Sequence, residues 1–251
     1  MKAMLFAAGK GTRLKPLTDT MPKALVPVCG KPLLEHVLGK LSSAGFNDVV
    51  INVHHFAGQI QDYVGNHSAP GVRISFSDES EELLETGGGI KKAAALLNDG
   101  EPFLVHNVDI LSNVNLRDFY DFHLKNAGKT EIVATLLVSE RRTSRYLIFD
   151  ENDFLVGWTN ADTGEVRSPY KDLKYPSPCI RKYAFGGIHV MSPLVFKYME
   201  PFPKAFPIMD FYLSVCAECR IKAYVKKDLE LVDVGKLNSL ETAESFLRGR
   251  M

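Results

Sequence analysis

Apolar positions along the first 110 residues fall into short runs that alternate with longer amphipathic stretches. Short runs rich in β-branched residues predict buried strands, and apolar residues three or four positions apart predict helices. The predicted strands cover residues 3–8, 48–53, 72–75 and 102–106, and the predicted helices cover residues 32–44, 57–66 and 88–97. Strands separated by helices at this rhythm predict a mostly parallel sheet with helices on both faces, a Rossmann-like, doubly wound α/β fold.

The pattern changes after residue 109. A predicted helix at 116–125 is followed by three successive strands with no helix between them, at 131–138, 146–149 and 154–158. A proline-containing surface loop is predicted at 168–182. The remaining predicted elements are strands 184–191 and 221–226 and helices 207–219 and 239–248. This succession predicts that an antiparallel strand group extends the parallel core, giving a mixed sheet. We expect residues 1–251 to form a single domain.

Composition sets the broad class of the protein. A chain of 251 residues with 45% hydrophobic content suits one globular domain. Its 30 basic and 30 acidic side chains cancel, which argues against a protein that coats nucleic acid or an anionic membrane. No apolar run approaches the ~20 residues needed to span a bilayer, and the N-terminal apolar stretch is too short for a signal peptide. We therefore expect a cytoplasmic protein without nucleic-acid or membrane partners; the sequence does not indicate an oligomeric state.

Cysteine and histidine positions do not indicate a metal centre. Cys216 and Cys219 form a C-x-x-C, but no second such pair or suitably spaced histidine pair accompanies it. We interpret both as small apolar residues packed on a helix. His54 and His55 are adjacent at the end of a predicted strand, where neighbouring side chains point to opposite faces and do not readily share one metal.

The most informative segment is a glycine-rich loop that follows the first predicted strand, Ala-Ala-Gly-Lys-Gly-Thr-Arg-Leu-Lys-Pro-Leu-Thr at residues 7–18, with Pro-Lys at 22–23. Glycines let the backbone approach a ligand closely, and backbone N–H groups in such a turn suit phosphate oxygens. A guanidinium supplies a planar fork of donors and an ammonium a compact charge. The loop therefore predicts a nucleotide triphosphate site at Ala8, Gly9, Gly11, Thr12, Arg13 and Lys23.

Two familiar phosphate-binding motifs do not fit this spacing. A P-loop requires a lysine directly after its second glycine, and Thr12 stands there. A dinucleotide-binding fingerprint requires a small residue at position 14, which is Leu14. This mismatch argues against a dinucleotide-dependent oxidoreductase.

Two aspartates, Asp109 and Asp233, each follow an apolar strand. The carboxyl ends of strands are where open α/β sheets bind ligands, and carboxylates suit hard cations. A lone aspartate after a strand is more often a helix cap or a turn former. From the spacing alone both interpretations remain open.

The loop signature continues into Gly-Lys-Pro-Leu at residues 30–33, and the chain thereby resembles the sugar-1-phosphate nucleotidylyltransferases. The nearest branch contains uridylyltransferases for N-acetylmuramate 1-phosphate and guanylyltransferases for mannose and heptose 1-phosphates. Three later segments are typical of that branch: residues 84–90, 145–150 and 157–160. The resemblance covers nearly the whole chain and implies the nucleotide-diphospho-sugar transferase fold.

The resemblance also implies a reaction: a sugar 1-phosphate and a nucleoside triphosphate give a nucleotide sugar and pyrophosphate, with Mg²⁺ as cofactor. Arg13 and Lys23 are then expected to act on the phosphates as catalytic cations. The remaining roles that it implies are the base and ribose for Glu85, Thr86, Gly87 and Gly88, the metal for Asp109 and Asp233, and the sugar phosphate for Asn160, Gly187 and Arg145.

Two departures from the family pattern bear on activity. Val108 stands where many relatives have glycine before the metal-binding aspartate, and Lys236 follows the glycine at 235. They support the alternative of a non-catalytic, nucleotide-sugar-binding regulatory relative, whereas the intact Arg13, Lys23 and both aspartates favour an enzyme. We expect UTP as the nucleotide, with GTP next, and the sugar stays open.

Overall fold

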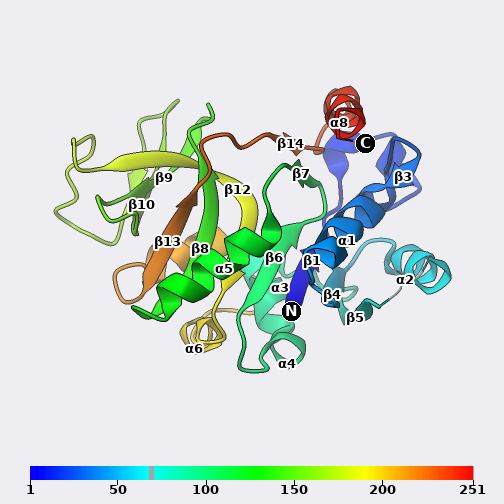
Figure 1. Cartoon of the computed structure of the whole chain (residues 1–251), viewed down its shortest axis with the longest axis horizontal. Coiled ribbons are helices and arrows are strands. Elements are labelled where there is room, and N and C mark those ends of the chain that lie inside the picture. The colour runs from blue at the N-terminus through cyan, green and yellow to red at the C-terminus, as the bar shows by residue number, and fades with distance from the viewer. Residues whose placement is uncertain (68–70, 251) are drawn as a thin grey trace.

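The computed structural model describes residues 1–67 and 71–250, in which a mixed sheet carries helices on both faces (Figure 1). Its parallel part runs in the order β5-β4-β1-β6. These strands are β1 (Lys2–Phe6), β4 (Asp48–Val53), β5 (Arg73–Asp78) and β6 (Phe103–Asn107). Because the strands are parallel, their carboxyl ends meet at one edge, where such sheets bind ligands.

An antiparallel group extends this core through the long strand β12 (Arg181–Met191). The C-terminal part of β12 pairs with β6, and its first residues pair with β9 (Arg145–Phe149). The change of partner falls at Gly187, whose φ is +71°, a conformation that favours glycine. The other strands of the group are β8 (Ile132–Ser139), β10 (Leu155–Asn160), β11 (Val166–Arg167) and β13 (Arg220–Val225).

Separate apolar clusters cover the two faces of the sheet. One contains α1 (Leu33–Ser43), α2 (Ala57–Asn66) and α5 (Leu116–Ala127), and Figure 1 shows α1 and α5 lying across the near face. The opposite face carries α3 (Glu85–Lys92), α4 (Ala94–Leu97), α6 (Val195–Met199) and α7 (Ile208–Val215). A third cluster packs α8 (Ser239–Arg248) against the segment that follows the glycine-rich loop.

The predicted mixed α/β fold is confirmed, with three kinds of correction. The helix predicted at 88–97 begins at Glu85 and divides at Ala93 into α3 and α4. The helix predicted at 207–219 covers only Ile208–Val215, and Arg181 already belongs to β12 rather than to the predicted loop. The short elements α6, β7 (Ile110–Ser112) and β14 (Leu231–Asp233) were not predicted, because three to five residues carry too little periodicity.

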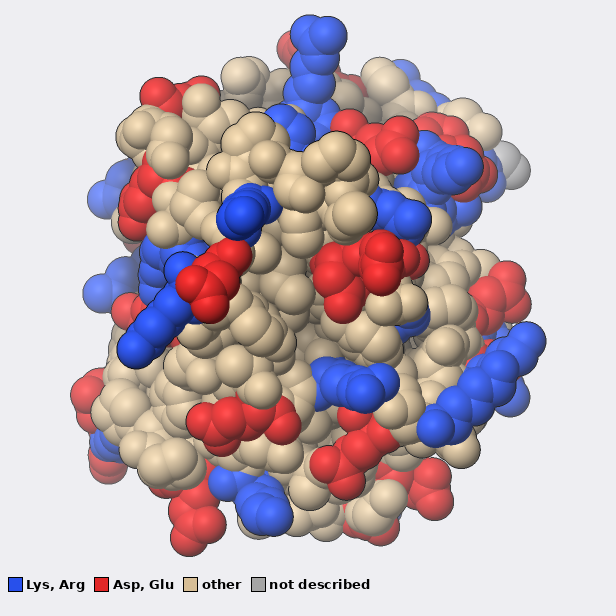
Figure 2. All heavy atoms as spheres, turned by 90° about the vertical axis from the view of Figure 1, so that its left-hand side faces the viewer, with Lys and Arg blue, Asp and Glu red and all other residues tan. Residues whose placement is uncertain are grey.

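No helix of the described residues is long and apolar enough to cross a membrane. The face at the β9–β10 end of the molecule shows basic and acidic side chains interspersed (Figure 2). Cys216 and Cys219 are free thiols buried in the core, which confirms the packing interpretation, but both lie beyond the end of α7 and not on a helix as predicted. Burial raises the pKa of Cys216 to about 11 and that of Cys219 to about 12, so both remain protonated and unreactive at neutral pH.

Three buried histidines predict loss of stability in mild acid. Burial lowers the pKa of His106 and His123 to about 4 and that of His189 to about 3. The same groups titrate near 6.5 in an unfolded chain. Below pH 6.5 the unfolded chain therefore binds protons that the folded chain does not. As the pH falls below 6.5, the free energy of unfolding of the protein should decrease by up to about 1.4 kcal/mol per pH unit for each histidine, until the pKa of that histidine in the folded protein is reached.

Urea unfolding at pH 7, 6 and 5 measures this dependence. His123→Leu removes one titrating group and should make the decline less steep. The exposed His55 provides the control, since His55→Gln should leave the slope unchanged. An unaltered slope in His123→Leu would show that burial of this histidine does not cause the acid sensitivity.

Candidate active site

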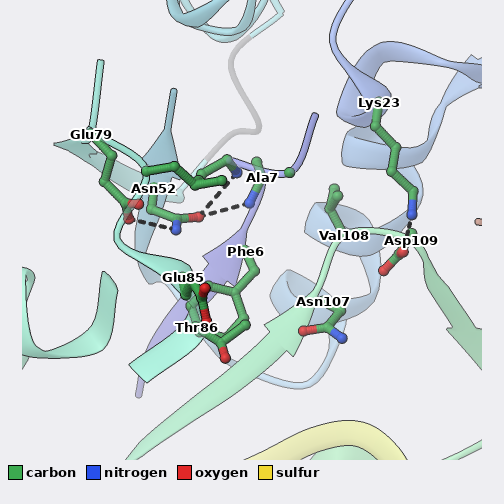
Figure 3. Close-up of a pocket in the computed structure, with 13 residues that line it drawn as sticks. Phe6, Ala7, Lys23, Asn52, Glu79, Glu85, Thr86, Asn107, Val108 and Asp109 are labelled. Atoms are coloured by element: carbon green, nitrogen blue, oxygen red, sulfur yellow. Dashed lines mark hydrogen bonds and ion pairs between the residues drawn. The ribbon is translucent and has the colours of Figure 1, made fainter. Parts of the chain in front are cut away.

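A cavity of about 390 Å³ opens at the carboxyl ends of β1, β4 and β6 (Figure 3). The glycine-rich loop forms one wall, and the turn that begins α3 forms another. A single Lys or Arg side chain, that of Lys23, lines it among the described residues. The full lining is Phe6, Ala7, Ala8, Gly9, Lys23, Asn52, Glu79, Leu83, Glu85, Thr86, Asn107, Val108 and Asp109.

The glycine-rich loop turns at Gly11. This residue has a φ of +64°, and its carbonyl accepts hydrogen bonds from the Leu14 N–H and the Thr18 hydroxyl, both at 2.8 Å. A Cβ at position 11 would lie 2.9 Å from Thr18 Cγ2. Both the backbone conformation and the close contact therefore require glycine. The turn leads into a one-turn 3-10 helix at Thr12–Leu14.

A second cavity of about 340 Å³ adjoins the first and shares Gly9, Lys23 and Leu83 with it. Its other walls are the predicted phosphate-binding residues Gly11, Thr12 and Arg13, together with Lys10 and Gly235. Ala8 differs from the rest of the loop: its N–H donates to Asn52 Oδ1 at 3.3 Å and is therefore engaged within the protein. In the described parts of the chain no protein acceptor takes the N–H of Gly9 or Lys10, so these amides remain available to a ligand.

Lys23 and Asp109 form an ion pair where the two cavities meet. Lys23 begins a 3-10 helix at Lys23–Leu25, and its ammonium contacts Asp109 Oδ2 (Figure 3). The two side chains are only 12% and 18% exposed. Partial burial strengthens this pairing relative to a surface ion pair, because less water screens the charges.

The backbone places Asp233 beside Asp109. Strand β7 pairs antiparallel with β14, which sets Ile110 opposite Asp233, and the Val234 N–H donates to the Asp109 carbonyl at 2.8 Å. Arg13 lies close to the same point, because a Cβ at Gly235 would be 2.7 Å from both Arg13 Nη2 and Asp233 Oδ1. The structure thus brings the backbone of Asp233 next to that of Asp109, which pairs with Lys23, and sets Arg13 beside Asp233; Asp233 itself lines neither cavity.

The carboxylates fit a cation that takes most of its ligands from water and substrate. Among the described residues, no group of three or more His, Cys, Asp or Glu side chains is arranged to hold a metal. Mg²⁺ is commonly bound by one or two carboxylates plus substrate phosphates, and two carboxylates are present here.

Asn52 and Glu79 also line the main cavity, although the sequence analysis did not single them out. Asn52 Oδ1 accepts from the Ala7 N–H at 2.8 Å, and Asn52 Nδ2 donates to Glu79 Oε1 at 2.8 Å. The other oxygen of Glu79 accepts from the Leu84 N–H at 3.1 Å. The available signal was a polar residue, Asn52, within an otherwise apolar predicted strand, since buried polar groups need partners.

The segment predicted to follow the base and ribose divides into two parts. Glu85 and Thr86 line the cavity, and Glu85 has a φ of +58°, a strained conformation for a residue other than glycine. Gly87 and Gly88 are buried away from the lining, and both N–H groups donate to the Phe206 carbonyl. These two glycines therefore permit close packing of α3.

Gly88→Ala should destabilise the fold. The added Cβ would lie 2.3 Å from the Lys204 carbonyl oxygen, a backbone atom that cannot rotate away. We expect a loss of about 1–3 kcal/mol in the free energy of unfolding, measured by urea titration. Gly65→Ala is the matched control, because Gly65 lies in α2 with nothing within 4 Å of the added Cβ. Equal stability of the two variants would contradict the packing role.

Of the three residues predicted to bind the sugar phosphate, Gly187 lies apart from the other two. Gly187 is close to the main cavity, since its Cβ would lie 2.9 Å from Asn107 Nδ2. Asn160 and Arg145 face each other across β10 and β9 in the antiparallel group, and neither lines the cavity. Their role in sugar binding stays a prediction.

The two departures from the family pattern differ in their position relative to the cavities. Val108 lines the cavity without a positive φ, and its N–H donates to the Phe6 carbonyl at 3.1 Å. Lys236 is exposed in the turn before α8, where its carbonyl accepts from the Ser239 hydroxyl at 2.6 Å. A β-branched residue is therefore accommodated at position 108, and Lys236 lines neither cavity.

The molecule has a mixed α/β sheet, a loop that turns at a glycine and a lysine–aspartate pair at the carboxyl edge of the sheet. These features define a nucleotidyltransferase of the nucleotide-diphospho-sugar transferase type. The fold matches the solved structure of a putative glucose-1-phosphate thymidylyltransferase from Bacillus anthracis, with a TM-score of 0.78 at 18% identity over 99% of this chain and 95% of that one. A family model described as nucleotidyl transferase matches residues 2–249, and the chain belongs to that family.

Curated relatives add detail at the sequence level. The N-acetylmuramate alpha-1-phosphate uridylyltransferase of Caulobacter vibrioides is 50% identical over 193 residues, covering 76% of this chain and 75% of the relative. The enzyme of the same name from Neisseria meningitidis is 50% identical over 115 residues, covering 46% of this chain and 49% of the relative. Mannose-1-phosphate guanylyltransferases, such as the Dictyostelium discoideum catalytic subunit beta, are matched over about half of their length, 56% in that case.

Proposed function

We propose that this protein joins a sugar 1-phosphate to the nucleotidyl group of UTP, releasing pyrophosphate. The observation that carries the proposal is the Lys23–Asp109 pair, which stands where the two cavities meet. One cavity has mixed apolar and polar walls that suit a base and ribose. The other is lined by loop residues and three cationic side chains, Lys10, Arg13 and Lys23, that suit phosphates.

In the proposed reaction an oxygen of the sugar phosphate attacks the α-phosphorus of the nucleotide, and the bond from that phosphorus to pyrophosphate breaks. The attacking phosphate is already largely ionised at neutral pH, because its second pKa is about 6. No general base is therefore needed. The protein has to align two anions and offset their charge, which Lys23, Arg13 and the loop amides do.

Asp109 and Asp233 are the residues that would hold Mg²⁺. Asp109 contacts Lys23 through Oδ2, which leaves Oδ1 for a cation. When bound, the ion neutralises phosphate charge and favours one orientation of the triphosphate.

UTP is proposed first because two relatives at 50% identity are named as uridylyltransferases, with GTP second because guanylyltransferases also match. The same two names make N-acetylmuramate 1-phosphate the first sugar phosphate to test. Asn160, Gly187 and Arg145 are the residues proposed for its recognition.

Pyrophosphate release tests the function directly. Each of the four common nucleoside triphosphates is combined with a panel of hexose, hexosamine and N-acetylmuramate 1-phosphates in the presence of Mg²⁺. We expect UTP with one sugar phosphate to give the highest kcat/KM. Nucleotide binding without pyrophosphate release in any combination would instead favour the non-catalytic regulatory relative.

A further inference from the structure

Two buried polar side chains connect opposite walls of the main cavity. Asn52 is 3% exposed and Glu79 is 1% exposed. On one side, Asn52 Oδ1 accepts the N–H groups of Ala7 and Ala8, where the glycine-rich loop begins. On the other side, Glu79 Oε2 accepts the N–H of Leu84, the residue before Glu85. The link between them is the hydrogen bond from Asn52 Nδ2 to Glu79 Oε1, visible in Figure 3.

The backbone conformation of Glu85 explains why the Asn52–Glu79 hydrogen bond affects the cavity proposed for the nucleotide. Glu85 holds a left-handed conformation, and the turn it forms presents Glu85 and Thr86 to the cavity. Such strain persists only when surrounding contacts fix it. The hydrogen bond from Leu84 to Glu79 is a contact of that kind. Gly89 makes room for the link, because a Cβ there would lie 2.8 Å from Glu79 Oε1 and 3.2 Å from Asn52 Nδ2.

We propose that Asn52 and Glu79 are a positioning pair that sets the spacing between the glycine-rich loop and the 84–86 turn, and so the affinity for the nucleotide. The donor and the acceptor in this pair are fixed by the surrounding hydrogen bonds. Both oxygens of Glu79 accept from protein donors, and the Asn52 amide is oriented because its oxygen accepts backbone N–H groups. The kinetic part of this proposal rests on the proposed function, whereas the hydrogen-bond pairing itself does not.

The donor and acceptor roles determine which substitutions disrupt the pair. In Glu79→Gln the new amide NH₂ must face either Asn52 Nδ2 or the Leu84 N–H, so two donors meet. In Asn52→Asp two carboxylates face each other. Each single variant therefore leaves a buried group unpaired or two like charges in contact, which costs considerably more than removing both partners together.

The reciprocal double variant Asn52→Asp with Glu79→Gln repairs every link. The new carboxylate at position 52 would accept from the backbone N–H groups of Ala7 and Ala8 and from the new amide NH₂ at position 79. The amide oxygen at position 79 would accept from the Leu84 N–H. Net charge and side-chain size stay the same. Only the direction of the central hydrogen bond is reversed.

The test measures the unfolding temperature, the Kd for UTP, and kcat and KM for wild type, both single variants and the double variant. We expect each single variant to unfold at a lower temperature and to raise the KM for UTP about tenfold, with a smaller change in kcat because neither side chain lines the second cavity, the one proposed for the phosphates. The double variant should recover most of both losses, which a merely volume-filling role would not produce. Glu82→Gln is the matched control: Glu82 is exposed and pairs with Lys204 at 2.7 Å, so its KM should equal that of wild type.

Failure of the pairing and failure of the function give different results. A double variant as impaired as the single ones, or a Glu79→Gln enzyme indistinguishable from Glu82→Gln, would overturn the positioning pair. A wild-type protein that neither binds UTP nor releases pyrophosphate would instead refute the proposed function. The unfolding temperatures would still decide the pairing in that case. If a single variant does not fold, a folded double variant supports the pair and an unfolded one overturns it.

Discussion

Lys23→Ala should lower kcat for pyrophosphate release by about a hundredfold or more while the protein stays folded. The ammonium stands where the two cavities meet, so its loss removes positive charge from the place where two phosphate groups must approach each other. Lys23 lies at the cavity wall and packs no core cluster, so the protein should stay folded, with a modest fall in unfolding temperature because Asp109 loses its partner. Steady-state kinetics with saturating substrates and a thermal melt measure both effects.

Lys31→Ala is the matched control, since Lys31 is exposed and pairs with Glu35 at 3.0 Å. It should retain wild-type kcat. If Lys23 acts only by holding Asp109 in place, excess Mg²⁺ should restore much of the activity of Lys23→Ala, because the freed carboxylate would bind the cation more readily. Activity that stays low at every Mg²⁺ concentration supports direct action on the phosphates. Wild-type turnover in Lys23→Ala would remove this residue from the mechanism.

Three elements have the bounds that the sequence predicts. Strand 48–53 and helices 57–66 and 239–248 begin and end where the sequence predicts. In the strand, consecutive apolar residues reflect burial on both faces, as in a parallel sheet. Local pattern and tertiary environment agree in these segments, so the sequence alone determines them.

Helix α3 shows the opposite case. Its consecutive glycines at 87, 88 and 89 have poor intrinsic helix propensity, so the predicted helix began only at residue 88. The structure begins it at Glu85, and the N–H groups of Gly87 and Gly88 donate to the Phe206 carbonyl. This contact joins segments more than a hundred residues apart, and local sequence pattern does not encode it.

The candidate site was predicted in part for a related reason. The loop residues and Lys23 belong to one short motif, which a sequence displays directly. The approach of Asp109 to Asp233 depends on the pairing of β7 with β14, two strands of three residues each. The Asn52–Glu79 pair depends on the arrangement of β4 and β5 with the 84–86 turn. A buried asparagine predicts that some partner exists, but only the fold shows which one.

Asp109→Asn should reduce turnover by about a hundredfold or more and raise the Mg²⁺ concentration needed for half-maximal activity. The substitution keeps the size of the side chain but removes the negative charge that attracts a hard cation. Asp233→Asn should act in the same direction, since β14 sets this residue beside Asp109. Titration of activity with Mg²⁺ at fixed UTP and sugar phosphate measures the shift.

Asp228→Asn is the control for a general loss of negative charge. Asp228 is exposed and pairs with Lys226 at 2.9 Å, so the Mg²⁺ dependence of Asp228→Asn should match that of wild type. The Mg²⁺ concentration needed for half-maximal activity, here called the midpoint, distinguishes a role of Asp109 as metal ligand from a role as the partner of Lys23. A reduced kcat with an unchanged midpoint in Asp109→Asn would mean that the carboxylate acts through Lys23 alone. A raised midpoint in both Asp109→Asn and Asp233→Asn is expected only if the two carboxylates bind one cation, because the two residues otherwise share no side-chain partner in the described structure.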